Sequence, residues 1–585
     1  MSSQLSIFLL WLLYATMFHR AASGTSFHLV CNEKDRSALQ IFKLGVVNHS
    51  NKLPSWSSQQ DCCSWKGVHC DNNTGRVTRL DLKQQYLEGE INLSLFQIQF
   101  LSYLDLSLNG FTSLSAPFDA HASFSNLFNL KSLFIGGESL SGVLHENHFS
   151  NLSNLEALVL NAPFSFDLAS DWIPPFQLEG ISLSNAKLGP KFPEWLYTQH
   201  SLVYLEVPNS SISSINGDQF WRFVANITQL NLSKNNISAD LTNITLNSQL
   251  IFMDHNNFTG GLPHISANVI YLDLSRNSFY GPIAPLFCHK LGSQNNLDYL
   301  DISFNLLTGG VPDCWEYWKG LSFLFMESNM LTGELPPSIA TFIDLIALDL
   351  HNNRLSGHFS LDLSNITNLE FINIKQNNFS GTVPTKMPRA MEVMLLGSNQ
   401  FEGNIPTQLC NLSSLIQLDL FHNNLSGPIP PCISDIPSMG GAQRTSHYPF
   451  EFNLYNKGQE LQYEDYGLLR TLDLSSNNLS GEIPSQVFSL EAMMMPLKPS
   501  HSTLGQELVL QWDFGGFGVL YSLTGHGSVC DVIGYGIRNR LRITGYAIAR
   551  GSNSGGNWRR LGPQLSTADS VEARRGEAIV FLSPA

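Results

Sequence analysis

The sequence predicts an elongated solenoid of stacked leucine-rich coils, and three observations support this fold class. A motif of the form LxxLxLxxNxLxGxIP recurs along most of the chain, and a fixed period is the signature of a repeat architecture. Its LxL core alternates inward and outward residues, as a short strand does. An Asn follows each strand and favours a turn. The motif is cleanest at Leu297, Leu321, Leu345, Leu369, Leu415 and Leu469.

Each coil contributes one apolar face to a shared core. In residues 415–430 the inward-facing set is Leu415, Leu418, Leu420, Leu425 and Ile429. Asn423 stands where its amide can bond backbone groups that the turn leaves unpaired. Because one coil cannot bury its own apolar face, neighbours must stack. We expect a horseshoe or superhelix of the α/β type, with a parallel strand ladder on the concave face and irregular or 3₁₀ segments opposite.

Aligning the strand positions gives roughly sixteen units. We expect the repeats over residues 77–436, then an interruption at 437–466 and a last recognisable repeat at 467–491. The units begin at Val77, Leu101, Leu130, Leu155, Leu178, Leu202, Ile227, Ser248, Val269, Leu297, Leu321, Leu345, Leu369, Met391, Leu415 and Leu469.

The first residues resemble a secretory signal. An apolar stretch from Ile7 to Phe18 is followed by the small residues Ala21, Ala22, Ser23 and Gly24. The stretch is shorter than the roughly 20 apolar residues that span a bilayer. We expect residues 1–24 to be a cleaved signal peptide; a buried N-terminal helix is the alternative, and the stretch lacks the usual preceding Lys or Arg.

Eight of the nine cysteines fall into patterns that suit disulfides, as an oxidising compartment allows. Four lie in the expected N-terminal cap, residues 25–76, where a bond between the neighbours Cys62 and Cys63 would be strained. We predict Cys31–Cys62 and Cys63–Cys70.

The other four occupy equal phases of successive repeats. Cys288 and Cys410 are each twentieth in their units, and Cys314 and Cys432 are each eighteenth in the next. Equivalent positions in stacked coils lie about 5 Å apart, which suits a disulfide. We predict Cys288–Cys314 and Cys410–Cys432, with buried thiols as the alternative.

Sequons for N-glycosylation are dense, and secretion would make them acceptors. Several arise from the repeat grammar itself, in NNLSG and NLSxL. Asn231 is more informative, because it occupies an outward strand position where a glycan would obstruct part of the concave face. The predicted acceptors are Asn48, Asn72, Asn92, Asn151, Asn209, Asn226, Asn231, Asn236, Asn243, Asn257, Asn365, Asn378, Asn411, Asn424 and Asn478.

The chain resembles the ectodomain of a plant leucine-rich-repeat receptor-like protein, most closely the ethylene-inducing-xylanase receptor type. The resemblance rests on the cap, with CNEKDRSALQIFK at Cys31–Lys43 and LPSW and DCCSWKGVHC within Leu53–Cys70, and on the LSGxIP style of repeat. It also rests on YNKGQELQYEDYGLLRTLDLSSNNLSGEIP at Tyr455–Pro484. The resemblance implies a cell-surface protein that binds a microbial or cell-wall-derived protein or peptide in defence signalling and acts with co-receptor kinases.

The interruption at 437–466 resembles the island of this family, which in related receptors helps to form the ligand or partner surface. Its aromatic and acidic residues suit recognition. A flexible spacer is the alternative, given Gly440 and Gly441 and no apolar periodicity. The candidate partner-binding residues are Tyr455, Tyr463, Glu464 and Tyr466.

The candidate ligand-binding residues are aromatic residues that depart from the repeat consensus at outward positions of the concave face. Most outward positions carry the Asp of LDLS, which we treat as part of the repeat consensus and not as a binding residue. Exposed aromatics on a rigid surface are frequent binding anchors; the alternative is that the rings shield neighbouring strands. We expect exposed rings at Phe252, Phe325, Phe371 and Phe421, and we include Tyr271 and Tyr299 in the site.

Composition argues against several other functions. A formal net charge of −15 without a basic stripe in the repeats disfavours nucleic-acid binding. We find none of the Walker, GxSxG, HExxH or kinase motifs, so we expect no enzyme, no cofactor and no metal site. His145 and His148 have HxxH spacing but lack a third ligand, and we expect them to face solvent.

After about Glu491 the chain changes character, and residues 492–585 are expected to be an irregular or disordered tail outside the family pattern. The tail contains Cys530 and no apolar run of about 20 residues, so no membrane-spanning segment is expected in this chain. Unless the tail covers them, the last repeat's leucines would lack a cap. The resemblance implies the plasma membrane; without an anchor, the chain would be apoplastic. A secreted inhibitor of a polygalacturonase-type glycanase and a truncated decoy are the alternative functions.

Overall fold

The computed structural model describes residues 30–47, 53–57, 59–114, 124–288, 295–439, 452–456, 459–463, 469–481, 484 and 509–513. They form two compact units, one ending at Leu345 and the other beginning at Ile346. We call them the N-terminal unit and the C-terminal unit and describe each by itself. The expected signal peptide lies outside the described residues.

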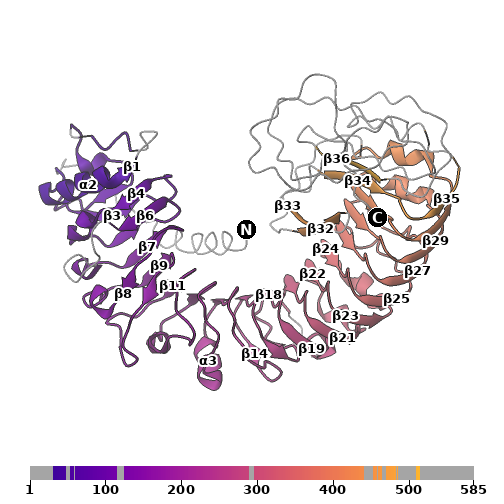
Figure 1. Ribbon diagram of the computed structural model, residues 1–585, viewed down its shortest axis with the longest axis horizontal. Coiled ribbons are helices and arrows are strands. Elements are labelled where there is room, and N and C mark those ends of the chain that lie inside the picture. Colours follow the sequence, from indigo (N-terminus) through magenta and orange to yellow (C-terminus); the bar gives the residue numbers. More distant parts are fainter. Residues whose placement is uncertain are drawn as a thin grey trace, which may run out of the picture. The chain divides into compact units, whose positions relative to one another are not determined.

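A ladder of short parallel strands runs through the N-terminal unit, one strand for each predicted coil (Figure 1). The central residue of each strand points into the core; Leu104 and Leu300, for example, are fully buried. The strands are β3 (Val77–Asp81), β5 (Tyr103–Asp105), β7 (Ser132–Gly136), β9 (Ala157–Asn161), β11 (Gly180–Ser182), β12 (Tyr204–Glu206), β13 (Gln229–Asn231), β15 (Leu250–Phe252), β18 (Tyr271–Asp273), β20 (Tyr299–Asp301) and β22 (Phe323–Phe325).

The C-terminal unit repeats this arrangement with five parallel strands. Leu418 and Leu472 fill its core in the same way and are fully buried. The strands are β24 (Ala347–Asp349), β26 (Phe371–Asn373), β28 (Val393–Leu395), β30 (Gln417–Asp419) and β34 (Leu469–Asp473). The predicted fold class, a leucine-rich-repeat solenoid with a parallel strand ladder, is therefore confirmed.

A second row of parallel strands follows the ladder in both units, which the sequence analysis did not anticipate. The LxGxI part of the motif forms it, and its glycines have positive φ, as Gly333 (81°) and Gly381 (88°) do. In the N-terminal unit the strands are β4 (Glu88–Ile91), β6 (Gly110–Leu114), β8 (Val143–Leu144), β10 (Ser165–Phe166), β16 (Thr259–Gly260), β19 (Ser278–Pro282), β21 (Leu306–Gly310) and β23 (Met330–Gly333). A separate parallel pair is formed by β14 (Thr245–Leu246) and β17 (His264–Ile265). In the C-terminal unit they are β25 (Arg354–His358), β27 (Asn378–Thr382), β29 (Gln400–Asn404), β31 (Asn424–Gly427) and β35 (Asn478–Leu479).

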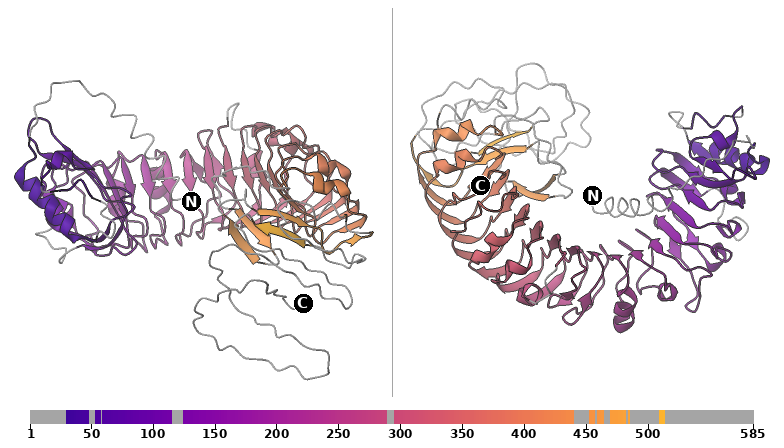
Figure 2. Two further views of the ribbon diagram at one scale, coloured as in Figure 1. Left: turned by 90° about the horizontal axis from the view of Figure 1, so that it is seen from above. Right: turned by 180° about the vertical axis from the view of Figure 1, so that it is seen from behind.

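Short helices lie on the side away from the ladder in many of the coils, as α3 of the N-terminal unit does (Figure 1 and Figure 2). The buried rings of Phe287, Trp315 and Phe342 pack in sequence behind the strands, with centroids 4.3 and 5.1 Å apart. The helices of the N-terminal unit are η2 (Leu93–Gln97), η3 (Phe124–Asn126), η4 (Glu146–His148), η5 (Glu194–Thr198), α3 (Gly217–Val224), α4 (Ala284–Phe287), η6 (Trp315–Tyr317) and η7 (Pro337–Thr341). Those of the C-terminal unit are η8 (Thr407–Asn411) and η9 (Pro431–Asp435).

A cap closes the first edge of the ladder. It consists of α2 (Glu33–Gly45), β1 (Val46–Val47), η1 (Cys62–Ser64) and β2 (Val68–Cys70), and β2 pairs antiparallel with β3. Asp35 is only 1% exposed; its carboxylate accepts the Val77 N–H of β3 and pairs with Arg76 at 3.1 Å. Trp56 and Trp65 stack beneath, 5.1 Å apart. The cap thus satisfies backbone groups and covers leucines that the first coil would expose.

The Asn of each regular repeat ties neighbouring coils together. Asn423 Nδ2 donates to the carbonyl groups of Leu396, Leu420 and Phe421, and its Oδ1 accepts the Phe401 N–H at 2.9 Å. This is the role predicted from its position. The residue before it, His422, has a φ of 50°, and a positive φ recurs at the equivalent place in most repeats.

Two features lie at the far end of the C-terminal unit. The predicted island contains a hairpin, β32 (Phe452–Asn456) paired antiparallel with β33 (Gln459–Tyr463). In the predicted tail, β36 (Val509–Asp513) pairs antiparallel with β34 along all five residues. The backbone edge of the last ladder strand is therefore covered, so at this segment the tail is ordered and does not leave the repeat uncapped.

Candidate ligand-binding surface

The candidate surface is the ladder face, formed by the side chains that flank the buried central residue of each ladder strand. In β20, Tyr299 and Asp301 flank Leu300. Strand register aligns Tyr271 with Tyr299, and Asp273 with Asp301. Because the register is parallel and constant, every outward residue stands beside its counterpart on the next coil.

Four predicted ligand-binding residues of the N-terminal unit form one continuous stack on this face. The rings of Phe252 and Tyr271 lie 4.6 Å apart between centroids, and those of Tyr271 and Tyr299 lie 4.1 Å apart and nearly parallel, at 5°. Tyr299 then contacts Phe325 at 5.5 Å. Phe323, which the sequence analysis did not select, joins at 6.1 Å from Tyr299. The structure thus brings together rings from four coils.

The expectation that these rings are exposed is wrong for most of them. Phe252, Tyr299 and Phe325 are 7, 7 and 6% exposed. Phe371 in the C-terminal unit is 3% exposed. The physical reason is that rings on adjacent strands are close enough to cover one another's faces, since ladder strands are about 4.8 Å apart. This corresponds to the alternative reading, in which the rings shield neighbouring strands.

Carboxylates lie at the border of the aromatic stack. Their surroundings disfavour the charged form, so their pKa values are raised. Burial, followed by repulsion from Asp254, raises the pKa of Asp273 to about 7. Burial and repulsion from Asp273 and Glu327 raise the pKa of Asp301 well above its usual range. The Asp273 carboxylate accepts bonds from the Ser275 N–H and hydroxyl at 3.0 and 2.7 Å. The Asp of the LDLS motif therefore stabilises the turn, as expected for a residue of the repeat consensus. Its pKa is also raised at Asp273 and Asp301.

Positive groups at this part of the ladder face are already engaged. The Arg276 guanidinium lies over the Phe304 ring, 3.9 Å from its centroid. His255 Nδ1 pairs with Asp254 at 2.8 Å. The surface around the stack is thus apolar in its middle and acidic at its border.

The ladder face of the C-terminal unit has a different character. Phe421 stands just after β30, half-buried beside His422 at 5.7 Å. Lys375 Nζ pairs with Asp419 at 2.5 Å, and both side chains are 12% exposed. Burial, followed by repulsion from Asp419, raises the pKa of Asp473 to about 6, and Lys375 opposes this shift.

Sequence reasoning missed a buried polar cluster in the same unit. His351 Nδ1 pairs with the Asp349 carboxylate at 2.7 Å, and Asn373 Nδ2 donates to the other Asp349 oxygen at 3.0 Å. His351 is 2% exposed. The available signal was the departure LDLH from the usual LDLS. Because the three side chains are buried and bonded to one another, the arrangement suits a structural role.

The island residues can be placed only in part. Tyr455 lies on β32 and Tyr463 ends β33. Glu464 and Tyr466 lie outside the described residues. Their role as a partner-binding surface stays a prediction.

The structure contains disulfides at Cys31–Cys62, Cys63–Cys70, Cys288–Cys314 and Cys410–Cys432, the four pairs that the sequence predicts. Their Cα atoms are 5.5–5.8 Å apart.

The expectation that both histidines of the HxxH pair face solvent is wrong for His148, which is 2% exposed. Its Nδ1 accepts the backbone N–H of His145.

Most predicted glycan acceptors are accessible. Asn48 lies outside the described residues. Asn92 is half-buried and caps η2 by accepting the Ser94 N–H. Asn231 is 6% exposed, and its Oδ1 accepts bonds from the Ser233 N–H and hydroxyl. The exposed acceptors are Asn72, Asn151, Asn209, Asn226, Asn236, Asn243, Asn257, Asn365, Asn378, Asn411, Asn424 and Asn478.

None of the helices in the described part of the chain combines the length and apolar character needed to cross a membrane.

Similarity to known proteins agrees with this architecture. Residues 32–71 match the leucine rich repeat N-terminal domain, and residues 296–318, 414–436 and 468–490 match the leucine rich repeat. Receptor-like protein EIX2 of Solanum lycopersicum is 37% identical over 191 residues, which cover 31% of this chain and 18% of that protein. Receptor-like protein EIX1 of the same species is 32% identical over 309 residues, covering 48% and 27%.

The chain thus spans about a quarter or less of the length of these relatives. Among solved structures, the PEPR1–AtPEP1 complex aligns at 20% identity with a TM-score of 0.37, covering 79% of this chain and 81% of that one. At that level the alignment carries no argument about function. The capped repeats and the matched segments show that the chain is a leucine-rich-repeat solenoid, and it is similar to plant receptor-like proteins, the tomato EIX1 and EIX2 proteins among them.

Proposed function

We propose that this protein is a non-catalytic recognition module of the plant receptor-like type, acting outside the cell. Its ladder face would bind a microbial or cell-wall-derived protein or peptide in defence signalling. The observation that carries the proposal is the aromatic stack on a rigid ladder, in which the half-buried Tyr271 reaches the surface between the nearly covered rings of Phe252 and Tyr299. Preformed aromatic surfaces with polar borders are favoured centres of protein interfaces, because little side-chain entropy is lost when they are covered.

Several features support an extracellular role for the module. The disulfides require an oxidising compartment, and twelve sequon asparagines stand exposed for modification. The relatives EIX1 and EIX2 carry the name receptor-like protein. We further propose that the island hairpin β32–β33 and the last coils contact a co-receptor kinase, and that a longer receptor-like context provides attachment to the plasma membrane.

The proposal is tested with the secreted full-length chain and a fungal xylanase as probe, a choice that follows from the likeness to the EIX receptors. We expect Phe325→Ala and Phe421→Ala each to weaken binding by about tenfold or more, the usual cost of removing an aromatic anchor. Tyr280→Ala is the matched control, because Tyr280 is 55% exposed on β19 and lies off the ladder face.

Secretion yield and melting temperature must be measured for each variant, since Phe325 is also part of the packing. Normal binding by both ladder-face variants would refute the aromatic surface as the recognition site. A polygalacturonase serves as a second probe. Binding to it with loss of its activity, in the absence of xylanase binding, would instead establish the inhibitor function.

A further inference from the structure

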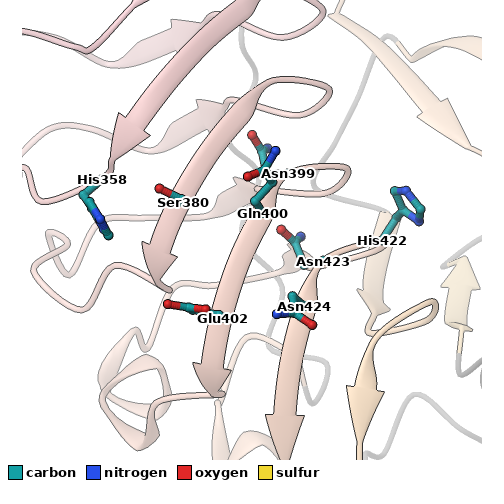
Figure 3. Close-up of a pocket in the computed structure, with 8 residues that line it drawn as sticks. All are labelled: His358, Ser380, Asn399, Gln400, Glu402, His422, Asn423 and Asn424. Atoms are coloured by element: carbon teal, nitrogen blue, oxygen red, sulfur yellow. The ribbon is translucent and has the colours of Figure 1, made fainter.

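A polar groove lies on the second row of strands in the C-terminal unit, away from the ladder face. It has a volume of about 550 Å³ and crosses four neighbouring strands, β25, β27, β29 and β31 (Figure 3). Every lining side chain is polar. The lining residues are His358, Ser380, Asn399, Gln400, Glu402, His422, Asn423 and Asn424.

The side chains of four of these residues already have partners in the fold. Asn399 and Asn423 use their amides on backbone groups of adjacent coils, so they form the floor. Ser380 Oγ donates to the Gly357 carbonyl group, and Gln400 Nε2 donates to Asn378 Oδ1. The Glu402 carboxylate and the imidazoles of His358 and His422 stand around this floor. The exposed surface of this lining is more polar than apolar. It suits a polyhydroxylated occupant, such as an oligosaccharide, better than an apolar small molecule.

One residue of the lining is a predicted glycan acceptor. Asn424 begins the sequon Asn424-Leu425-Ser426, and its side chain is exposed. It stands in register with Glu402 on the neighbouring strand, so the two side chains share one face about 5 Å apart. A sugar attached to Asn424 Nδ2 would therefore begin at one end of the groove, beside the carboxylate. The remaining polar groups extend from there across two further strands.

We propose that this groove seats the first sugars of an N-linked glycan carried by Asn424. Sugar hydroxyls donate to the Glu402 carboxylate and to Gln400 Oε1 and bond the His358 imidazole, which holds the sugar rings against the second row of strands. The lateral face of the C-terminal unit is then assigned to carbohydrate, and a protein partner must use another face. A free oligosaccharide has the same chemistry and is the competing occupant.

The test uses the full-length chain secreted from plant cells, with site-specific glycopeptide mass spectrometry. Asn365 is the matched comparator, because it is exposed in the same unit and away from the groove. Under native conditions we expect an endoglycosidase to trim the Asn424 glycan about tenfold more slowly than the Asn365 glycan, as expected for one charge-assisted hydrogen bond. After denaturation the two rates should become equal.

Variants locate the protection. Glu402→Gln combined with His358→Ala should raise the trimming rate at Asn424 to that of Asn365, whereas Asp435→Asn, exposed outside the groove, should leave it slow. An unoccupied Asn424, or equal native rates at the two sites, would overturn the proposal. Binding of cellulose- or xylan-derived oligosaccharides by Asn424→Gln, abolished by Glu402→Gln, would also overturn it and assign the groove to an external sugar.

Discussion

Replacing Asp273 with Asn should stabilise the N-terminal unit at neutral and alkaline pH. Asn keeps an oxygen that can accept the bonds from Ser275 and removes a charge that burial and Asp254 disfavour. The pKa of Asp273 in the folded state is about 7, against an ordinary value of 3.8 for an Asp carboxyl. A carboxyl whose pKa is raised by folding costs stability as pH rises from its unfolded value through its folded one.

The full shift would correspond to about 4 kcal/mol at pH 8, using 1.36 kcal/mol for each pH unit. Asp273 is half-buried and coupled to its neighbours, so solvent screening reduces this to about 2 kcal/mol. The groups that face it include Asp254 and Asp301, which oppose its charge, and Arg276, which favours it. We therefore expect the variant to gain about 2 kcal/mol at pH 8 and nothing at pH 4.

Thermal unfolding between pH 4 and 8 measures this difference. The wild-type chain should lose stability across that interval, and Asp273→Asn should lose less. Asp298→Asn is the control, because Asp298 is exposed just before β20. Hydrogen exchange of the β18 and β20 amides localises the effect. If the stability of the wild type and of Asp273→Asn changed with pH in the same way, the conclusion that the charged Asp273 carboxylate costs stability would be refuted.

Four further outcomes follow from the packing. Asn305→Ala should cost about 3 kcal/mol, because the amide that bonds three carbonyl groups and one N–H of the backbone is lost inside the core; chemical denaturation measures it. Lys375→Met should cost about 2 kcal/mol and move the Asp473 pKa further upward, as NMR titration would show. Gly397→Ala should also destabilise, since its Cβ would lie 2.6 Å from Asp419 Oδ1. Asn231 should carry no glycan in the secreted protein, and an occupied Asn231 in folded material would contradict this.

The positions of the inward-facing leucines could be predicted because they depend on contacts that every coil repeats. Once the period is known, Leu300 and Leu418 must face inward, and Asn423 must meet the unpaired groups of its turn. The disulfide partners follow in the same way. Cys410 and Cys432 hold equal phases to Cys288 and Cys314, and stacking converts equal phase into proximity.

The sequence predicted which residues form the candidate site, but the prediction that their rings are exposed was wrong. The sequence shows that Tyr271 and Tyr299 interrupt the grammar, but it does not show that their rings stack at 4.1 Å and cover their neighbours. The same difficulty applies to Asn231. Its sequon is also a strand-end turn motif, and burial by adjacent coils decided between the two.

By itself, the sequence determined the repeat, the direction of each side chain in the ladder and the pairing of the cysteines, because these follow from a short period acting along one chain. Only the tertiary structure decided the burial of the rings, the pKa of Asp273 and the groove beside Asn424. It also decided that β36 covers the edge of β34. Each of these depends on which side chains neighbouring coils or distant segments bring into contact, and a single repeat does not encode that.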